Sequence, residues 1–302
     1  MFSISKKTLA LTAAIATGSM LTACSNDEGG SEGSESAAPD KNLSIGVAAG
    51  WDEGVVMSNL AAVVLEDNGY TVDLRDADVG VIYTGLSEGD FDLFLDAWLP
   101  ITHKAYVEKY GDKIEDLGAW YEEAKLTFAV NNDSPITSIE ELADNADAFD
   151  NAIIGIDAGA GITEVTQNEV IPTYGLESMD YKLSSTAAML AELDGAMRRG
   201  DNIVVTLWKP HWAYAKFDIR DLEDPEGALG GTEAVHSFAR AGFTEDYPEI
   251  AQALDDFSIT DEELSDLENF VINENSDRDS REATREWLEN NPEVRDRFTL
   301  DN

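Results

Sequence analysis

From residue 41 onward, short runs rich in β-branched residues alternate with longer amphipathic stretches. Strands are predicted over residues 43–47, 71–74, 91–95, 153–156, 180–183 and 203–207. Helices are predicted over 53–68, over a short stretch ending near Gly89, and over 163–174 and 185–199. This alternation is typical of an α/β protein with parallel sheets and right-handed crossovers.

The pattern contains an internal duplication. The segment Ile45-Gly46-Val47-Ala48-Ala49-Gly50-Trp51 resembles Ile154-Gly155-Ile156-Asp157-Ala158-Gly159-Ala160, and Trp98-Leu99-Pro100 resembles Trp208-Lys209-Pro210. The first residues of the paired motifs are 53 and 54 residues apart in the two copies. Two repeated motifs at matched spacing predict two lobes with similar structures. Each motif follows a predicted strand, so the motifs belong at the carboxyl edges of the sheets, where ligands bind in α/β folds.

The tail is predicted to be helical over 249–257, 261–273 and 280–290, with Thr260 and Ser280 as N-caps. We expect these helices to pack on the first lobe. The predicted boundaries are residues 42–128 and 235–302 for lobe 1, and 129–234 for lobe 2.

Acidic residues dominate the charge of the chain. There are 61 Asp and Glu against 20 Lys and Arg, a formal net charge of −41, and hydrophobic residues make up 43% of the sequence. The hydrophobic content excludes wholesale disorder, and the charge argues against a nucleic-acid partner. A single cysteine excludes a disulfide framework and a cysteine-rich metal site. We predict no cofactor and no metal, and interpret the acidic surface as a solvated face.

The N-terminus has the pattern of a bacterial export signal. Lys6 and Lys7 precede an apolar stretch that is too short and too rich in Ala and Thr to span a membrane. The stretch ends in Leu21-Thr22-Ala23-Cys24, which resembles a lipobox. We therefore predict a signal peptide over 1–23, lipidation of Cys24, a flexible tether over 24–41, and a lipid-anchored protein on the extracytoplasmic face of the cell membrane.

Three tryptophans follow predicted strands. Trp51, Trp98 and Trp208 are expected in strand-to-helix loops, whereas Trp120 and Trp287 are expected in the core. Ordinary packing is the alternative for any one of the three, but three at equivalent edges favour a shared ligand box. Indole faces suit a quaternary ammonium group, because its charge is spread over methyl groups and each face contributes on the order of 2 kcal/mol.

Four motifs together resemble the glycine betaine-binding lipoproteins of osmoprotectant ABC transporters. They are Gly50-Trp51-Asp52-Glu53-Gly54, Trp98-Leu99-Pro100-Ile101-Thr102-His103, Gly159-Ala160-Gly161-Ile162 and Trp208-Lys209-Pro210-His211-Trp212. The resemblance extends from about residue 43 to about residue 257. It implies a two-lobed type II periplasmic-binding-protein fold with a ligand cleft between the lobes. It also implies an aromatic cage for the trimethylammonium group and a carboxylate site.

Carried over by motif, the cage consists of Trp51, Trp98 and Trp208. Some branches of the family have an aromatic residue where this chain has Ala160, so the third ring here comes from Trp51. The carboxylate donors are the backbone amides of Gly161 and Ile162, together with the His103 side chain. The residues support this independently, because the two amides open a predicted helix and a neutral histidine can still donate one N–H.

Other residues near these motifs have structural interpretations. Trp212 is expected to begin a helix, His211 to brace a loop and His236 to be structural. Asp52 and Asp96 are expected to hydrogen-bond backbone groups, although an inward-pointing Asp52 would favour choline.

The sequence thus predicts a non-catalytic, monomeric receptor that closes its lobes on a quaternary ammonium carboxylate and delivers it to an ABC permease. A receptor for choline or carnitine with the same fold remains an alternative. A secreted carbohydrate-active enzyme is a further one, with Glu53 and Asp96 as its acids. However, the sequence contains no nucleophile elbow, HExxH motif or phosphate loop.

Overall fold

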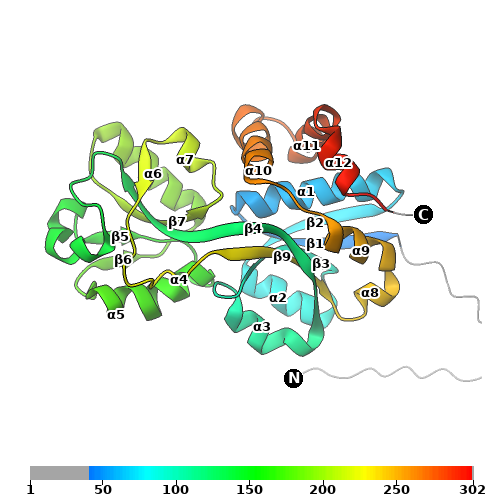
Figure 1. Cartoon of the computed structure of the whole chain (residues 1–302), viewed down its shortest axis with the longest axis horizontal. Coiled ribbons are helices and arrows are strands. Elements are labelled where there is room, and N and C mark those ends of the chain that lie inside the picture. Colours follow the sequence, from blue (N-terminus) through cyan, green and yellow to red (C-terminus); the bar gives the residue numbers. More distant parts are fainter. Residues whose placement is uncertain (1–40, 301–302) are drawn as a thin grey trace, which may run out of the picture. The chain divides into compact units, whose positions relative to one another are not determined.

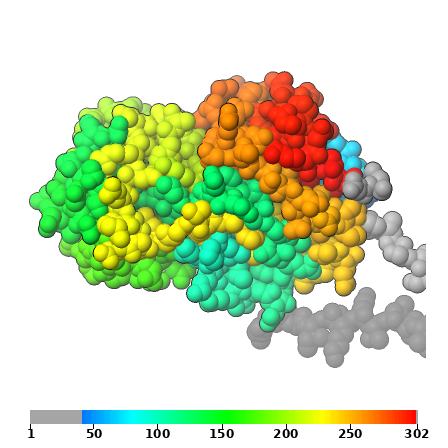
Figure 2. Space-filling model, in the orientation of Figure 1, coloured from blue at the N-terminus to red at the C-terminus, as the bar shows by residue number. Residues whose placement is uncertain are grey.

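The computed structural model describes residues 41–300, which Figure 1 and Figure 2 show in colour. The predicted signal peptide, the lipidation site Cys24 and all of the predicted tether except residue 41 lie outside the described residues. Within residues 41–300, no helix is long and apolar enough to cross a membrane.

The described residues contain a mixed β-sheet. Its strands are β1 (Asn42–Ala48), β2 (Thr71–Ala77), β3 (Leu93–Leu99), β4 (Ile114–Asn131), β5 (Ala152–Ile154), β6 (Asp180–Lys182), β7 (Val204–Lys209), β8 (Ile219–Asp221) and β9 (Glu233–Arg240). They pair in the order β2-β1-β3-β9-β4-β7-β5-β6, and β8 pairs with β4. The halves of this sheet form two lobes (Figure 1), and β4 and β9 connect them.

The expectation of parallel sheets is correct for only part of each lobe. β1 is parallel to β2 and β3, and β5 is parallel to β6 and β7. β9 is antiparallel to β3 and β4, and β4 is antiparallel to β7. The two connecting strands run in opposite directions because one leaves lobe 1 and the other returns to it. The predicted boundaries between lobe 1 and lobe 2, at 128/129 and 234/235, fall inside β4 and β9. These boundaries remain a prediction.

Helices cover the sheets. They are α1 (Asp52–Asp67), α2 (Val79–Glu88), α3 (Lys104–Tyr110), α4 (Gly161–Val165), α5 (Ile171–Tyr174), α6 (Thr186–Arg199), α7 (Ala213–Lys216), α8 (Phe243–Asp246), α9 (Pro248–Asp256), α10 (Asp261–Glu268), α11 (Ser280–Asn290) and α12 (Pro292–Arg297). Short 3₁₀ segments lie at Gly111–Lys113, Ile139–Glu141 and Ala143–Phe149, and π-helical segments at Thr166–Val170 and Asn269–Glu274. The predicted helices over 163–174 and 261–273 therefore each contain a π segment.

Helix α1 is the central helix of lobe 1. All but one of the residues between Glu53 and Leu65 are buried, because the sheet covers one side of α1 and α10 and α11 cover the other (Figure 1). A helix that is apolar on all sides is stable only when it is enclosed in this way. This packing fixes the N-terminal end of α1, where the conspicuous Gly-Trp-Asp-Glu motif lies.

The C-terminal helices pack against lobe 1. Arg281 forms an ion pair with Glu66 at 2.5 Å, and Arg285 and Arg295 both pair with Asp67, all at the C-terminal end of α1. Thr260 caps α10 in a capping box with Glu263, as expected. The prediction that Ser280 caps the next helix is wrong: Asp279 is the N-cap, and its side chain accepts the N–H of Glu282.

Candidate functional site

One cavity lies where the two lobes meet. It contains about 270 Å³ of empty space, a volume that includes space open to solvent. Residues from both lobes line it: Trp51, Glu53, Trp98, Thr102, His103, Leu126, Ile156, Ala160, Gly161, Ile162 and Trp208. All six residues that the sequence suggested for ligand binding are thus brought together around one small space.

The three tryptophans are placed by different elements. Trp51 is the N-cap of α1 and lies between β1 and α1, in agreement with the predicted strand-to-helix loop. The prediction that Trp98 and Trp208 lie in loops is wrong, because they occupy the carboxyl ends of β3 and β7. Each pairs with a connecting strand, Trp98 with Val235 of β9 and Trp208 with Leu126 of β4. The two indoles therefore extend from the strands next to the junction between the lobes.

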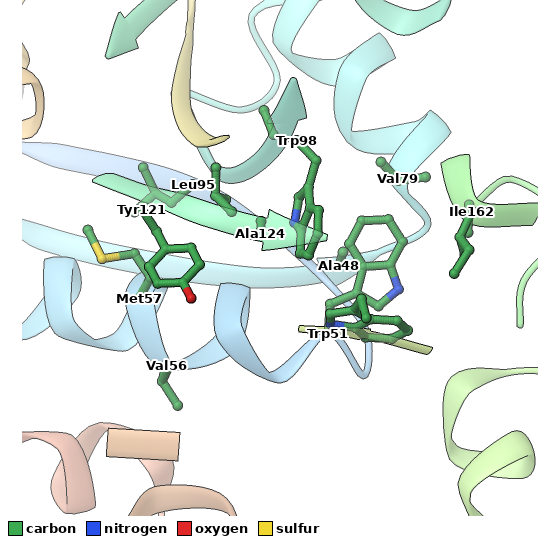
Figure 3. Close-up of a cluster of buried hydrophobic side chains, with 14 of the residues drawn as sticks. Ala48, Trp51, Val56, Met57, Val79, Leu95, Trp98, Tyr121, Ala124 and Ile162 are labelled. Atoms are coloured by element: carbon green, nitrogen blue, oxygen red, sulfur yellow. The ribbon is translucent and has the colours of Figure 1, made fainter. Parts of the chain in front are cut away.

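The rings form a buried aromatic wall. The Trp51, Trp98 and Trp208 side chains are 7%, 3% and 4% exposed. The Trp51 ring lies 6.5 Å from that of Trp208 at an interplanar angle of 64°, although the two come from different lobes. Figure 3 shows Trp98, Trp51 and Ile162 approaching one another. Such a wall offers several indole faces to one ligand and excludes water from it.

His103 is a neutral donor that faces the cavity. Its Nδ1 accepts the backbone N–H of Trp98 at 2.9 Å, so the ring hydrogen is on Nε2. The Nε2 atom is buried and has no hydrogen-bond partner among residues 41–300. Burial lowers the pKa of His103 to about 3, so the ring is neutral at physiological pH. The Trp51 ring stacks on His103 at 5.6 Å and an interplanar angle of 10°, which fixes the ring's orientation.

Backbone amides occupy the lobe 2 side of the cavity. Gly161 and Ile162 begin α4, where the first N–H groups have no partner within the helix. A Cβ added at Gly161 would lie 2.0 Å from the carbonyl oxygen of Thr102, so only glycine permits this approach of the lobes. On the opposite lobe, Glu233 of β9 accepts both backbone N–H groups of Ile101 and Thr102 at 2.8 Å, and this holds the loop before His103 in place.

Two buried acids lie behind the tryptophans. Asp96 accepts the indole N–H of Trp98 at 2.8 Å, and burial raises its pKa to about 7. Glu53 lines the cavity, and burial, with the nearby charges of Asp96 and Glu268, raises its pKa well above the usual range. The expectation that Asp96 bonds backbone groups is therefore wrong: its Oδ1 fixes a cage indole instead.

The other residues considered near the motifs make contacts within the protein, and for one of them, Asp52, the partner differs from the expected one. His211 accepts the N–H of Ala213 at 3.0 Å and packs against Trp208, and His236 pairs with Asp116 at 2.9 Å. Trp212 is the N-cap of α7, where a helix start was expected. The expectation that Asp52 bonds backbone groups is wrong, because it accepts the indole N–H of Trp212 across the lobes. Asp52 is not among the residues that line the cavity.

Sequence reasoning missed several lining residues. Leu126 lies beside Trp208 only because β4 and β7 pair in that register, which no local pattern reveals. Ile156 could have been found, since it belongs to the echoed Ile-Gly-Ile segment. Glu53 belongs to the Gly50-Trp51-Asp52-Glu53-Gly54 motif, but the sequence suggests it only as an acid of the alternative enzyme.

Two lobes joined by two strands, with one small aromatic cavity at their junction, define a solute-binding protein of the two-lobed periplasmic type. Residues 41–290 match the family described as the substrate-binding domain of ABC-type glycine betaine transport systems. The chain belongs to this family, whose members are transport components.

Individual relatives agree with the family match. The glycine betaine/carnitine transport binding protein GbuC of Listeria monocytogenes serotype 1/2a (strain 10403S) is 43% identical over 143 residues. That alignment covers 47% of this chain and only 46% of the relative's length. The structure of lactococcal OpuAC in its closed-liganded conformation with glycine betaine has a TM-score of 0.79 and 29% identity, covering 86% of this chain and 100% of that one. A choline-binding protein of an ABC transporter, in complex with choline, has a TM-score of 0.78 and 27% identity, covering 85% and 91%.

Proposed function

We propose that this protein captures glycine betaine, or a closely related quaternary ammonium carboxylate, outside the cytoplasm and delivers it to an ABC permease. The cage of Trp51, Trp98 and Trp208 holds the trimethylammonium group. His103 and the amides of Gly161 and Ile162 hold the carboxylate. Lobe closure forms the site, because the cage and the carboxylate site each take residues from both lobes.

The observation that carries this proposal is the pairing of opposite chemistries in the lining of one cavity at the junction of the lobes. Indole faces attract a cation that cannot donate a hydrogen bond. The unpartnered Nε2–H of His103 and the free amides at the start of α4 favour an anion. A small zwitterion with a methylated nitrogen satisfies both sets at once.

Choline is the second candidate, and one observation favours it. The Oε2 atom of Glu53 is buried, has no hydrogen-bond partner in the part of the chain that the structure describes, and belongs to a residue that lines the cavity. A hydroxyl group on the ligand could donate to this oxygen. Carnitine, which carries both a hydroxyl and a carboxylate, is a related candidate.

The geometry argues against a carbohydrate-active enzyme. Such an enzyme needs two carboxyl groups facing the scissile bond. Here only Glu53 lines the cavity, whereas one oxygen of Asp96 is bonded to the Trp98 indole.

Calorimetric titration tests the proposal with glycine betaine, carnitine, choline, maltose and tert-butylacetate, in which a neutral carbon replaces the cationic nitrogen of glycine betaine and the carboxylate is kept. Glycine betaine is expected to bind tightest, and tert-butylacetate at least tenfold more weakly, because it lacks the positive charge that the indoles attract. Equal binding of glycine betaine and tert-butylacetate would refute the cage. Preference for choline would assign the alternative ligand.

We further propose that Cys24 carries lipid and that the mature protein is a monomer on the outer face of the membrane. The support is the single cysteine at the end of the signal-like segment. Cys24→Ser is expected to abolish labelling with a radioactive fatty acid and release the protein into the soluble fraction, while light scattering should give the monomer mass. Unchanged labelling would contradict the anchor.

A further inference from the structure

Trp212 is the second tryptophan of the Trp-Lys-Pro-His-Trp motif, and the proposed ligand cage gives it no role. It does not line the cavity, yet it lies on lobe 2 directly against lobe 1. Its indole N–H donates to the Asp52 carboxyl at the start of α1. The Trp212 backbone also counteracts the rise in the pKa of Glu268, the last residue of α10, so it lies close to a second carboxyl group of the opposite lobe.

The carboxyl groups of Asp52 and Glu268 are costly to bury. Glu268 is 1% exposed, and one of its oxygens has no partner among residues 41–300. Burial, together with the neighbouring charge of Asp52, raises the pKa of Glu268 well above the usual range. Burial raises the pKa of Asp52 to about 6, and the Trp212 hydrogen bond opposes that rise. If the lobes closed without the Trp212 indole N–H, the carboxyl groups of Asp52 and Glu268 would be buried near each other with one hydrogen-bond donor fewer.

On both lobes, the residue that makes the Trp212–Asp52 contact lies close in sequence to a cage residue. On lobe 1, Asp52 directly follows the cage residue Trp51 at the start of α1. On lobe 2, Trp212 lies four residues after the cage residue Trp208, with His211 packed between the two rings. A ligand that draws Trp51 and Trp208 together therefore also brings Asp52 and Trp212 together.

We propose that Trp212, with Asp52 as its acceptor, is a latch that holds the two lobes closed and sets how slowly the ligand leaves. This inference rests on the proposed function only for its choice of ligand. Trp212 is a positioning residue, since it acts on the closed state and is not among the described residues that line the cavity. A second contact between the lobes, from the Tyr106 hydroxyl to the Gly159 carbonyl at 2.8 Å, is exposed and contributes less.

The test is Trp212→Phe, which removes the indole N–H and keeps an aromatic ring. The matched control is Trp120→Phe, because the Trp120 indole is also buried and donates at 2.8 Å, but to Leu95 within lobe 1. Dissociation of radiolabelled glycine betaine is followed by rapid filtration after dilution, together with the association rate and the melting temperature of the ligand-free protein.

Trp212→Phe is expected to speed dissociation about tenfold, the scale of one hydrogen bond to a buried carboxyl group. Its association rate and ligand-free melting temperature should match the wild type, because the latch forms only on closure. Trp120→Phe should lower the melting temperature and leave the dissociation rate unchanged. A dissociation rate for Trp212→Phe equal to that of the wild type, or equal acceleration in both variants, would overturn the latch.

Asp52→Ala provides the second arm and serves if Trp212→Phe is poorly folded. It should also speed dissociation, and the double variant should dissociate no faster than the faster single variant, since both remove the same bond. Additive effects would overturn the inference. Absence of glycine betaine binding by the wild type would instead count against the proposed function, so the two failures are distinguishable.

Discussion

The imidazole Nδ1 of His103 accepts the backbone N–H of Trp98 at 2.9 Å, and the backbone N–H of His103 donates to the Trp98 carbonyl at 3.0 Å. This reciprocal pair ties the carboxylate-binding donor to a cage tryptophan. It also sets the tautomer, since Nδ1 must be an acceptor and Nε2 carries the hydrogen. The orientation of the donor is therefore decided by the backbone of the residue that supplies a cage ring.

His103→Ala is expected to weaken glycine betaine binding roughly ten- to a hundredfold, the scale of a hydrogen bond to a charged group. Choline should lose less, because it has no carboxylate for Nε2–H to bind. Calorimetry with both ligands makes the comparison, and His236→Ala, which alters a histidine outside the cavity, is the control. An equal loss for both ligands would show that His103 does not recognise the carboxylate.

Replacing Trp98 or Trp208 with Ala should weaken glycine betaine binding by about 1–2 kcal/mol each. Phe at either position should give an intermediate affinity, because it keeps a smaller aromatic face. Calorimetric titration of the graded series Trp, Phe and Ala measures the effect. If both Ala variants bind as well as the wild type, the cage is not formed by these rings.

Gly161→Ala should reduce affinity more than tenfold while leaving ligand-free stability nearly unchanged. The new Cβ would lie 2.0 Å from the carbonyl oxygen of Thr102 on the opposite lobe, so it obstructs closure and not the folding of either lobe. Gly159→Ala is the matched control, since its Cβ would lie 3.6 Å from the Tyr106 hydroxyl, an ordinary contact. Calorimetric titration measures the affinity of both variants, and thermal unfolding measures their ligand-free stability. Equal affinities for the two variants would contradict the obstruction of closure by the new Cβ.

Asp96 makes stability depend on pH. Its pKa is about 7 in the folded protein against an ordinary value of 3.8, so the folded state binds a proton that the unfolded state does not. The free energy of unfolding therefore rises as pH falls through about 7, by on the order of 2–4 kcal/mol for this group by pH 4. Asp96→Asn should lose this rise.

Urea unfolding of the wild type and Asp96→Asn at pH 8 and pH 5 measures the difference. The advantage of the wild type over the variant should grow as pH falls, and contributions from the histidines cancel because both proteins contain them. Asp112→Asn, an exposed change, should show no such trend. A difference between wild type and Asp96→Asn that stays constant with pH would mean that Asp96 does not take up the proton.

Local patterns in the sequence predicted most elements of the structure. The helix that begins after Trp51, its end before Gly69, and the capping box of Thr260 depend on residues within a few positions of each other. The family resemblance carried by the motifs is confirmed, and so is the two-lobed fold. The assignment of individual ligand-binding residues stays a prediction.

The sequence by itself thus determined many of the helices and strands and which motifs carry conspicuous chemistry, because hydrophobic periodicity, caps and glycines act over a few residues. Only the tertiary structure decided that Trp98 and Trp208 end strands beside β9 and β4, and that Asp52 meets Trp212 from the opposite lobe. Those relations depend on strand register and helix packing between segments far apart in the chain, and no local period encodes them.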